Sequence, residues 1–174
     1  KAIGIIIDMQ EKLVPHMAHN AELIERTRVL LQGLEILGIP MLFTHQYKKG
    51  LGETVEPLQP FLQKENGIEK ITFSCCGENS FMEYLNRSDK KQVLVAGIES
   101  HVCVLQTVLD LLEENFLPVL VTDCISSRKI SEKEIALQRM QQSGAILTTT
   151  ESILFELQQT AGTSEFKEIS KLVK

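Results

Sequence analysis

Residues 93–106 read VLVAGIESHVCVLQ, and this stretch predicts a buried β-strand that turns directly into a helix. Residues 93–96 are apolar or small, and Gly97 ends the run. Ser100 is a good helix N-cap. Beyond it, apolar residues recur at helical spacing: Val102, Leu105, Val108, Leu109 and Leu112. The pattern therefore places Cys103 in the first turn of a helix that follows a buried strand.

Cys103 is a candidate nucleophile because of this position. Unpaired N–H groups and the positive end of the helix dipole gather in a first turn, so we expect the pKa of this thiol to lie below that of an ordinary cysteine. The same N–H groups are suited to receive an oxyanion. The simpler alternative is that Cys103 is a small core residue, since free cysteines are often buried and inert.

The composition is that of an ordinary globular protein. The 174 residues are 43% hydrophobic and 24% charged, and they fit one domain spanning residues 1–174. The net charge of -5 disfavours nucleic acid as a partner. No apolar run approaches the roughly 20 residues of a membrane span, and no signal peptide pattern is evident. We expect four reduced cysteines in a cytoplasmic compartment, with no membrane partner.

Apolar runs at regular intervals predict six strands, which cover residues 2–7, 41–44, 68–73, 93–97, 117–122 and 145–148. Helical patterns fall between and after them, at residues 20–37, 79–87, 131–143, 151–159 and 164–173. This alternation predicts a three-layer α/β/α fold with a six-stranded, mostly parallel, Rossmann-like sheet. Residues 45–66 lack clear periodicity and predict a long surface loop.

The carboxyl ends of parallel strands meet at one edge of a sheet, where open α/β folds bind ligands. The polar residues predicted at this edge are Asp8, His45, Lys70, Cys103 and Asp123. Three of them form a coherent set, in which Asp8 takes the thiol proton, Lys70 stabilises negative charge and Cys103 attacks a carbonyl carbon. The alternatives are ordinary: Asp8 as a turn cap and Lys70 as an exposed lysine.

The sequence contains no complete motif for a zinc site or for a dinucleotide-binding loop. His101 precedes Cys103 by two residues, but no Cys-x-x-Cys follows to complete a zinc deaminase site. Residues 50–52 read GLG and lack the third glycine of a dinucleotide-binding loop. We therefore expect neither a cofactor nor a metal.

Three segments, in this order, resemble the isochorismatase-like cysteine hydrolase superfamily: IIIDMQE around Asp8, GIEKITFSC around Lys70 and GIESHVC around Cys103. The resemblance covers nearly the whole chain and is closest to the isochorismatase-domain-containing proteins of uncertain substrate. Those proteins show segments similar to THQYKKGLGETVEPL, VTDCISSR and FKEISKLVK. The resemblance implies a catalytic triad of these three residues, a six-stranded parallel sheet and a homo-oligomer.

The resemblance also implies a non-proline cis peptide bond between Ile98 and Glu99, with an oxyanion hole made by the backbone N–H groups of Glu99 and Cys103. Nicotinamidases of this superfamily bind a metal through an Asp-x-His motif after the second strand. This chain has Gln46 and Lys48 there, so the resemblance implies neither that metal nor nicotinamidase activity.

Two hypotheses of different kinds remain open. The first is a cysteine hydrolase of a small amide or related carbonyl compound, with Tyr47, Phe73 and His101 as candidate residues of the substrate pocket. The alternative is a non-enzymatic binding or scaffold protein that retains the hydrolase fold. A redox sensor, which needs a second cysteine near Cys103, ranks below both.

Overall fold

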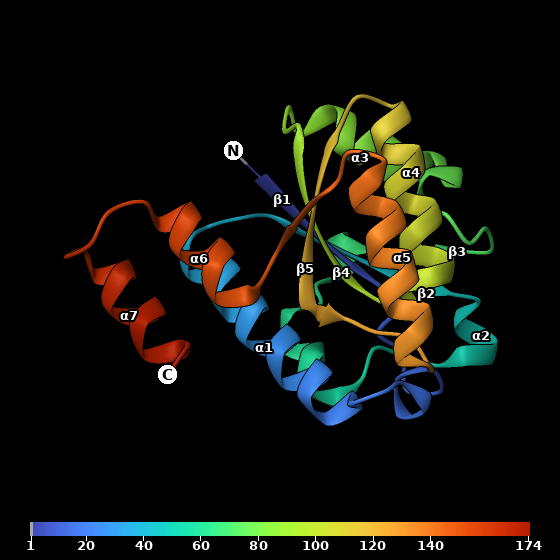
Figure 1. The fold of residues 1–174 in the computed structure, drawn as a ribbon, viewed down its shortest axis with the longest axis horizontal. Helices are drawn as coiled ribbons and strands as arrows, with labels where there is room; N and C mark the ends of the chain where they lie inside the picture. The colour runs from blue at the N-terminus through green and yellow to red at the C-terminus, as the bar shows by residue number, and fades with distance from the viewer. Residues whose placement is uncertain (1) are drawn as a thin grey trace.

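The computed structural model describes residues 2–174 and contains one six-stranded sheet with helices on both faces (Figure 1). The strands are β1 (Ala2–Ile7), β2 (Met41–Gln46), β3 (Gly67–Lys70), β4 (Gln92–Gly97), β5 (Leu117–Ile125) and β6 (Ile146–Thr148). Their order across the sheet is β3-β2-β1-β4-β5-β6, and every pairing of these strands is parallel. The predicted α/β fold is confirmed.

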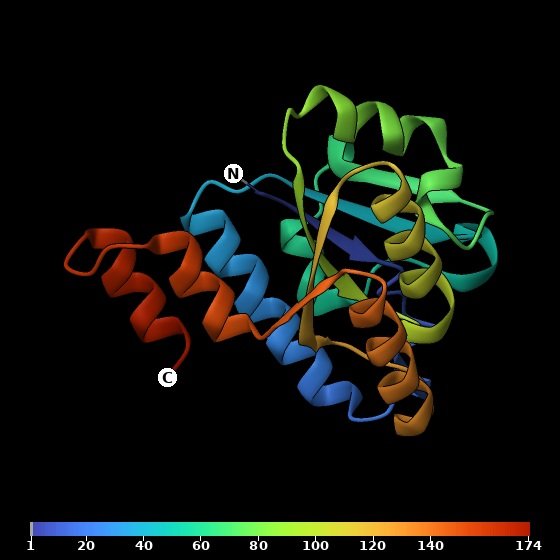
Figure 2. The same cartoon turned by 45° about the horizontal axis from the view of Figure 1, so that its top comes forward.

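The helices are α1 (Asn20–Ile36), α2 (Lys48–Leu51), α3 (Asn79–Arg87), α4 (Leu105–Glu113), α5 (Ile130–Gln142), α6 (Thr150–Gln158) and α7 (Ser164–Leu172). Helices α1, α6 and α7 lie on one face of the sheet, and α3, α4 and α5 lie on the other (Figure 2). Within residues 2–174, no helix combines the length and the apolar character that crossing a membrane requires.

The central strands β1 and β4 read as continuous apolar runs because both of their faces are buried. In β4, Val93 and Val95 pack in the core under α3, α4 and α5, whereas Leu94 and Ala96 pack against α1 and α6. Successive side chains of a strand point to opposite faces, so each face receives every second residue. This burial on both sides fixes the register of the central strands.

The segment 68–73 departs from its prediction, because strand β3 ends at Lys70. The Lys70 ammonium donates to the carbonyl oxygens of Thr72 at 3.2 Å and Phe73 at 3.0 Å. The chain therefore folds back around the lysine instead of continuing along β2. Residues 45–66 are also less irregular than predicted, since they include α2 and short 3₁₀ turns.

The strand order reverses at the centre of the sheet. Strand β1 pairs with β2 on one side and with β4 on the other, so the connections leave in opposite directions from this point. Open α/β sheets bind ligands in the crevice beyond the carboxyl ends of the strands at such a switch point. Asp8 follows β1 there, and the segment carrying Cys103 follows β4.

Gly97, at the end of β4, admits no side chain. Its φ is +124°, and a Cβ atom there would lie 2.1 Å from the carbonyl oxygen of Ile7. We expect Gly97→Ala to destabilise the protein by about 4 kcal/mol or more, because backbone strain and overpacking add. Urea denaturation of the two proteins measures this difference.

Gly38→Ala is the matched control, since Gly38 also has a positive φ, +62°, but no atom lies within 4 Å of the position that a Cβ would take. It should cost only about 1 kcal/mol, the penalty of the left-handed backbone alone. Equal losses of stability in the two variants would contradict the close approach of β4 to β1.

Candidate active site

Asp8 lies directly beyond β1 and is almost fully buried, with 1% of its surface exposed. Its φ of +52° is a left-handed conformation that Asp tolerates better than most residues. The backbone N–H of Asp8 donates to the carbonyl oxygen of Thr44 at 3.2 Å, and the Thr44 hydroxyl donates to Asp8 Oδ1 at 2.8 Å. One residue of β2 thus holds both the main chain and the carboxylate of Asp8.

Lys70 ends β3 and is also 1% exposed. Its Nζ lies 2.8 Å from Asp8 Oδ2 and donates to Gln46 Oε1 at 2.6 Å, besides the two carbonyl oxygens described above. Burial opposes the charged form most strongly, but it is outweighed by the effects that favour the ammonium, of which the negative charge of Asp8 is the largest. The pKa of Lys70 is therefore raised, and the ammonium is retained.

Cys103 lies in a π-helical turn, Ser100–Val104, that leads from β4 into α4. The residue is 7% exposed. Burial raises the pKa of the thiol to about 12, with the charge of Asp8 adding to the effect, while Lys70 opposes it. The expected low pKa is therefore wrong for the resting protein, because desolvation and a neighbouring carboxylate outweigh the lysine and the helix end.

Ser100 does not cap this helix as predicted. Glu99 occupies the N-cap position without a side-chain hydrogen bond to the turn, and the Ser100 hydroxyl instead contacts that of Ser127. Cys103 is thus in the fourth position of a wide turn, not in the first turn of a regular α-helix.

Asp8 Oδ2 faces the Lys70 ammonium. Among residues 2–174 it has no partner with hydrogen-bond geometry, although the Lys70 ammonium contacts it at 2.8 Å as an ion pair. Both charged groups act on the thiol of Cys103. The arrangement is a buried carboxylate and ammonium beside a neutral thiol, a set suited to moving one proton from sulfur to oxygen as sulfur attacks an electrophile.

The segment before Cys103 contains the backbone groups that the resemblance implies for an oxyanion hole. The peptide bond between Ile98 and Glu99 is cis. The carbonyl oxygen of Glu99 accepts the N–H groups of Val102 at 3.0 Å and Val104 at 3.2 Å. Within the described part of the chain, the N–H of Glu99 has no backbone acceptor, which leaves this donor available.

The candidate pocket residues lie in two different places. Tyr47 and Phe73, 51% and 54% exposed, both flank Lys70: the N–H of Tyr47 donates to the Lys70 carbonyl at 2.9 Å, and the carbonyl oxygen of Phe73 accepts from its ammonium. His101 points elsewhere. Its Nδ1 lies 2.9 Å from Ser127 Oγ, and it borders a cavity of about 190 Å³ with Arg128.

His45 and Asp123, which the sequence places at the same edge of the sheet, make structural contacts. His45 Nε2 shares a hydrogen bond of 2.8 Å with the Thr54 hydroxyl, and burial lowers the pKa of the imidazole. Asp123 Oδ1 accepts the backbone N–H of Thr150 at 2.9 Å and so caps the start of α6. Neither residue joins the Asp8–Lys70–Cys103 cluster.

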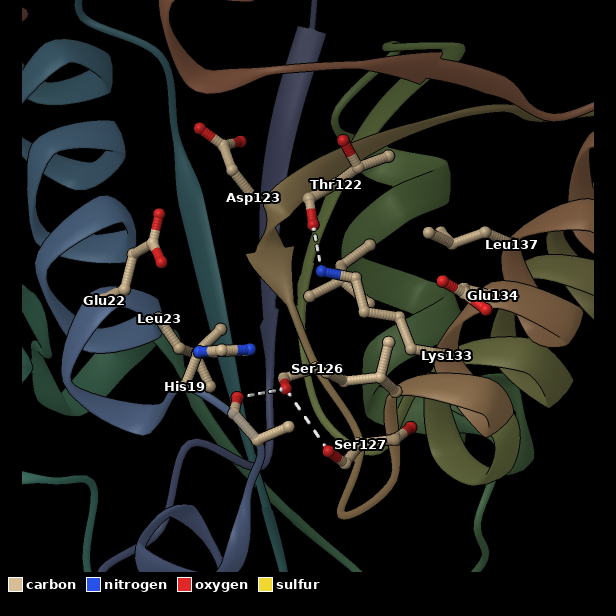
Figure 3. A pocket seen from close by; sticks show the side chains of 13 residues that line it. His19, Glu22, Leu23, Thr122, Asp123, Ser126, Ser127, Lys133, Glu134 and Leu137 are labelled. Carbon is tan, nitrogen blue, oxygen red and sulfur yellow. Dashed lines mark hydrogen bonds between the residues drawn. The ribbon is translucent and has the colours of Figure 1, made fainter.

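A larger cavity, of about 460 Å³, lies at the same edge but beyond β5, between α1 and α5 (Figure 3). Lys133 extends into it and donates to the carbonyl oxygen of Thr122 at 2.8 Å. Asp8, Lys70 and Cys103 do not line this cavity. Ser126 and Ser127 form part of its wall, and sequence reasoning missed both, although VTDCISSR had marked the segment as one shared with the resembled proteins.

Sequence reasoning also missed Thr44 and Gln46 as partners of the cluster. Both lie in β2, between the strands that carry Asp8 and Lys70, so only the strand order reveals their contacts. Within residues 2–174, no three His, Cys, Asp or Glu side chains come together in a group that could hold a metal ion.

Thr44→Val should destabilise the protein by about 1–3 kcal/mol, because it leaves Oδ1 of the buried Asp8 carboxylate without its hydrogen-bond donor. Urea denaturation measures the loss. Thr27→Val is the control: its hydroxyl is equally buried but donates to Leu23 of its own helix, so the cost should stay below about 1 kcal/mol. Equal losses of unfolding free energy in the two variants would show that the hydrogen bond from Thr44 to Asp8 stabilises the fold no more than the bond within the helix.

The fold and the site are those of an open parallel α/β protein with a buried carboxylate, lysine and cysteine near the switch point of the sheet. The family model described as the isochorismatase domain matches residues 2–152. The chain belongs to the isochorismatase family, whose members are generally hydrolases.

Two relatives and one solved structure illustrate this membership. Isochorismatase family protein 1B of Dictyostelium discoideum is 38% identical, over 97% of this chain and 84% of that protein. Isochorismatase domain-containing protein 2 of Danio rerio is 38% identical, over 99% of this chain and 86% of that protein. The structure of MAR1 ribonuclease from Caenorhabditis elegans is 37% identical with a TM-score of 0.93, covering 99% of this chain and 89% of that one.

Proposed function

We propose that this protein is a cysteine hydrolase of a small amide or related carbonyl compound. Cys103 is the nucleophile, Asp8 the proton acceptor and Lys70 the positive charge that stabilises the developing negative charge. The observation that carries the proposal is the buried Asp8–Lys70 ion pair, with Nζ 2.8 Å from Oδ2, whose two charges both act on the thiol of Cys103. A buried ion pair is costly to desolvate, so its presence at a switch point favours a functional role.

The proposed reaction conserves protons throughout. Cys103 Sγ bonds to the carbonyl carbon as its proton passes to Asp8, so a free thiolate need not accumulate. The N–H groups of Glu99 and Cys103 receive the oxyanion. The tetrahedral adduct then expels ammonia or an amine, which takes the proton from Asp8, and leaves a thioester. Water attacks the thioester and loses a proton to Asp8; the carbon–sulfur bond then breaks, Cys103 Sγ takes that proton back from Asp8, and the acid is released.

Tyr47 and Phe73 are proposed to contact the substrate, since both flank Lys70 with exposed aromatic rings. His101 is kept as a more distant candidate because it borders a separate cavity with Arg128. We propose no metal and no other cofactor, since the steps above require only side chains and backbone N–H groups of this chain.

A small-molecule substrate fits better than RNA, although the Caenorhabditis elegans relative is named a ribonuclease. The net charge of -5 does not favour a polyanion, whose binding depends largely on neutralising phosphates with Lys and Arg. Cys103 is also only 7% exposed, which suits a small carbonyl compound better than a polymer backbone.

One observation favours a second candidate, a non-enzymatic binding or scaffold protein. A thiol whose pKa is raised to about 12 is almost entirely protonated at neutral pH. A protein that only binds partners has no need for an activated thiol. The two candidates differ in whether Asp8 and Cys103 exchange a proton during a reaction, which an assay of turnover decides.

The deciding experiment is a screen of small primary amides for release of ammonia. We expect at least one amide to be hydrolysed by the wild-type protein and by Cys76→Ala, and not by Cys103→Ala. Incubation with single-stranded RNA should yield no fragments that depend on Cys103. RNA cleavage that is lost in Cys103→Ala would replace the amide proposal with a nuclease, and the absence of turnover on every amide would favour the scaffold.

We further propose that the chain forms a homo-oligomer in the cytoplasm. Large apolar side chains remain exposed on α5, with Ile130 at 48% and Ile135 at 57%, and beside Lys70, with Ile71 at 68%. Exposed apolar surface of this kind favours association. The four cysteines are free thiols, as in a reducing compartment. Size-exclusion chromatography with light scattering tests the assembly, and a mass equal to one chain would contradict it.

A further inference from the structure

Three consecutive residues after β5 contact three consecutive residues just before Cys103. The carbonyl oxygen of Ser126 accepts the N–H of Ser100 at 2.8 Å. The hydroxyl of Ser127 contacts the hydroxyl of Ser100 and lies 2.9 Å from Nδ1 of His101. One loop is therefore attached to the turn of the nucleophile by main-chain and side-chain bonds together.

Arg128 extends this contact to the N-cap residue of the turn. Its backbone N–H and its Nε both donate to Glu99 Oε2, at 3.2 and 3.1 Å. Arg128 is largely exposed, so this ion pair is weak by itself. The buried part of the contact is the hydroxyl of Ser127, which has no exposed surface, and that of Ser100, which has none either.

No side chain caps this turn, because the hydroxyl of Ser100 is directed to Ser127. The N–H groups of Ser100, Val102 and Val104 donate to backbone carbonyl oxygens instead. A serine at a helix start normally stabilises that helix by accepting one of its own N–H groups. Here the hydroxyl of Ser100 is instead bound by Ser127, a residue of the loop that follows β5. Cys103 lies three residues after Ser100 in the same turn.

We propose that Ser127 is a positioning residue for the Cys103 nucleophile. Its hydroxyl holds Ser100 and His101, and through them sets the direction of the Cys103 thiol toward Asp8 and of the Glu99 N–H toward the carbonyl oxygen of a substrate. This inference rests on the proposed function. Ser127 touches neither substrate nor reacting atoms, and it acts only through the turn that carries them.

The neighbouring Ser126 provides a matched control. Its hydroxyl is also buried, but it donates to the carbonyl oxygens of Ala18 at 2.9 Å and Ser127 at 3.4 Å and not to the turn of Cys103. Figure 3 labels Ser126 beside Ser127. Ser126→Ala keeps the backbone carbonyl that binds Ser100 and removes one buried hydroxyl from the same loop. Ser127→Ala removes a buried hydroxyl of the same size that contacts the turn. The two variants therefore differ in the contact under test.

The test measures two rates on the full chain. The first is the second-order rate constant for alkylation of Cys103 by iodoacetamide across pH 6–10, followed by mass spectrometry. The second is kcat and KM for an amide found in the screen. We expect Ser127→Ala to reduce kcat by about 10- to 100-fold with KM changed less than about threefold, and to change the alkylation profile of Cys103. Ser126→Ala should match the wild type in both measurements.

Ser100→Ala removes the other hydroxyl of the same contact. It is the variant to measure if Ser127→Ala does not fold. The double variant should lose no more kcat than the worse single variant, because Ser100→Ala breaks only a contact that Ser127→Ala already breaks. Wild-type kcat and alkylation in Ser127→Ala or Ser100→Ala would overturn the inference. Failure of the proposed function would appear differently, as amide hydrolysis that persists in Cys103→Ala.

Discussion

Replacing Cys103 by alanine is expected to reduce amide hydrolysis by on the order of 10⁴-fold or more, since a covalent mechanism has no substitute for its nucleophile. The fold should survive. Alanine removes a single sulfur atom from a packed position, and such a change costs about 1–2 kcal/mol. Turnover of a screened amide and urea denaturation, measured on the same preparation, separate the two effects.

Cys76→Ala is the control for this experiment. Cys76 is a partly buried thiol beside the fully buried Cys75, and burial raises its pKa to about 12, like that of Cys103. It makes no contact with Asp8 or Lys70 among the hydrogen bonds and ion pairs of residues 2–174. Hydrolysis should therefore be unchanged in Cys76→Ala. Full activity in Cys103→Ala would exclude the covalent mechanism.

Lys70→Met is expected to destabilise the protein by about 3–5 kcal/mol and to abolish turnover. Methionine fills the space of the lysine stem but leaves the buried Asp8 carboxylate without its counter-charge. Gln46 and the carbonyl oxygens of Thr72 and Phe73 lose their donor as well. The free energy of unfolding in urea measures the loss.

A double-mutant cycle with Asp8→Asn identifies the ion pair as the cause. Asp8→Asn alone leaves the Lys70 ammonium buried without a counter-charge and should also be costly. The double variant, which carries no buried charge from this pair, should lose less stability than the sum of the two single losses. Strict additivity would mean that the 2.8 Å contact contributes nothing specific to the fold. Turnover should be absent from all three variants.

The sequence predicts the fold well because its central strands are buried on both faces. Runs such as residues 2–7 and 93–97 are apolar throughout, and their lengths suit strands better than helices. The order of the strands in the sheet cannot be predicted from these runs, since hydrophobic periodicity indicates the type of each element but not which strands pair. The end of β3 is missed because Ile71 and Phe73 are apolar, while the turn is set by the ammonium of Lys70.

The three residues proposed for catalysis are predictable from the sequence because each follows or ends a strand and carries reactive chemistry. Their partners are not, since Thr44 and Ser127 carry common hydroxyls whose roles depend on distant contacts. The pKa of Cys103 is predicted in the wrong direction for a related reason. A helix start is visible in sequence, whereas burial and the nearby Asp8 charge are properties of the folded chain.

In the proposed mechanism, Asp8 keeps the Cys103 thiol protonated at rest and accepts its proton during attack. The most direct test is the pKa of Cys103 in the wild type and in Asp8→Asn, from the pH dependence of iodoacetamide alkylation. In Asp8→Asn the carboxylate no longer raises the pKa of Cys103, whereas Lys70 still lowers it. The pKa should therefore fall, and alkylation at neutral pH should accelerate. Amide hydrolysis should be lost, because the proton acceptor is gone. An unchanged pKa in Asp8→Asn, or hydrolysis that persists in it, would contradict the proposed pairing of Asp8 with Cys103.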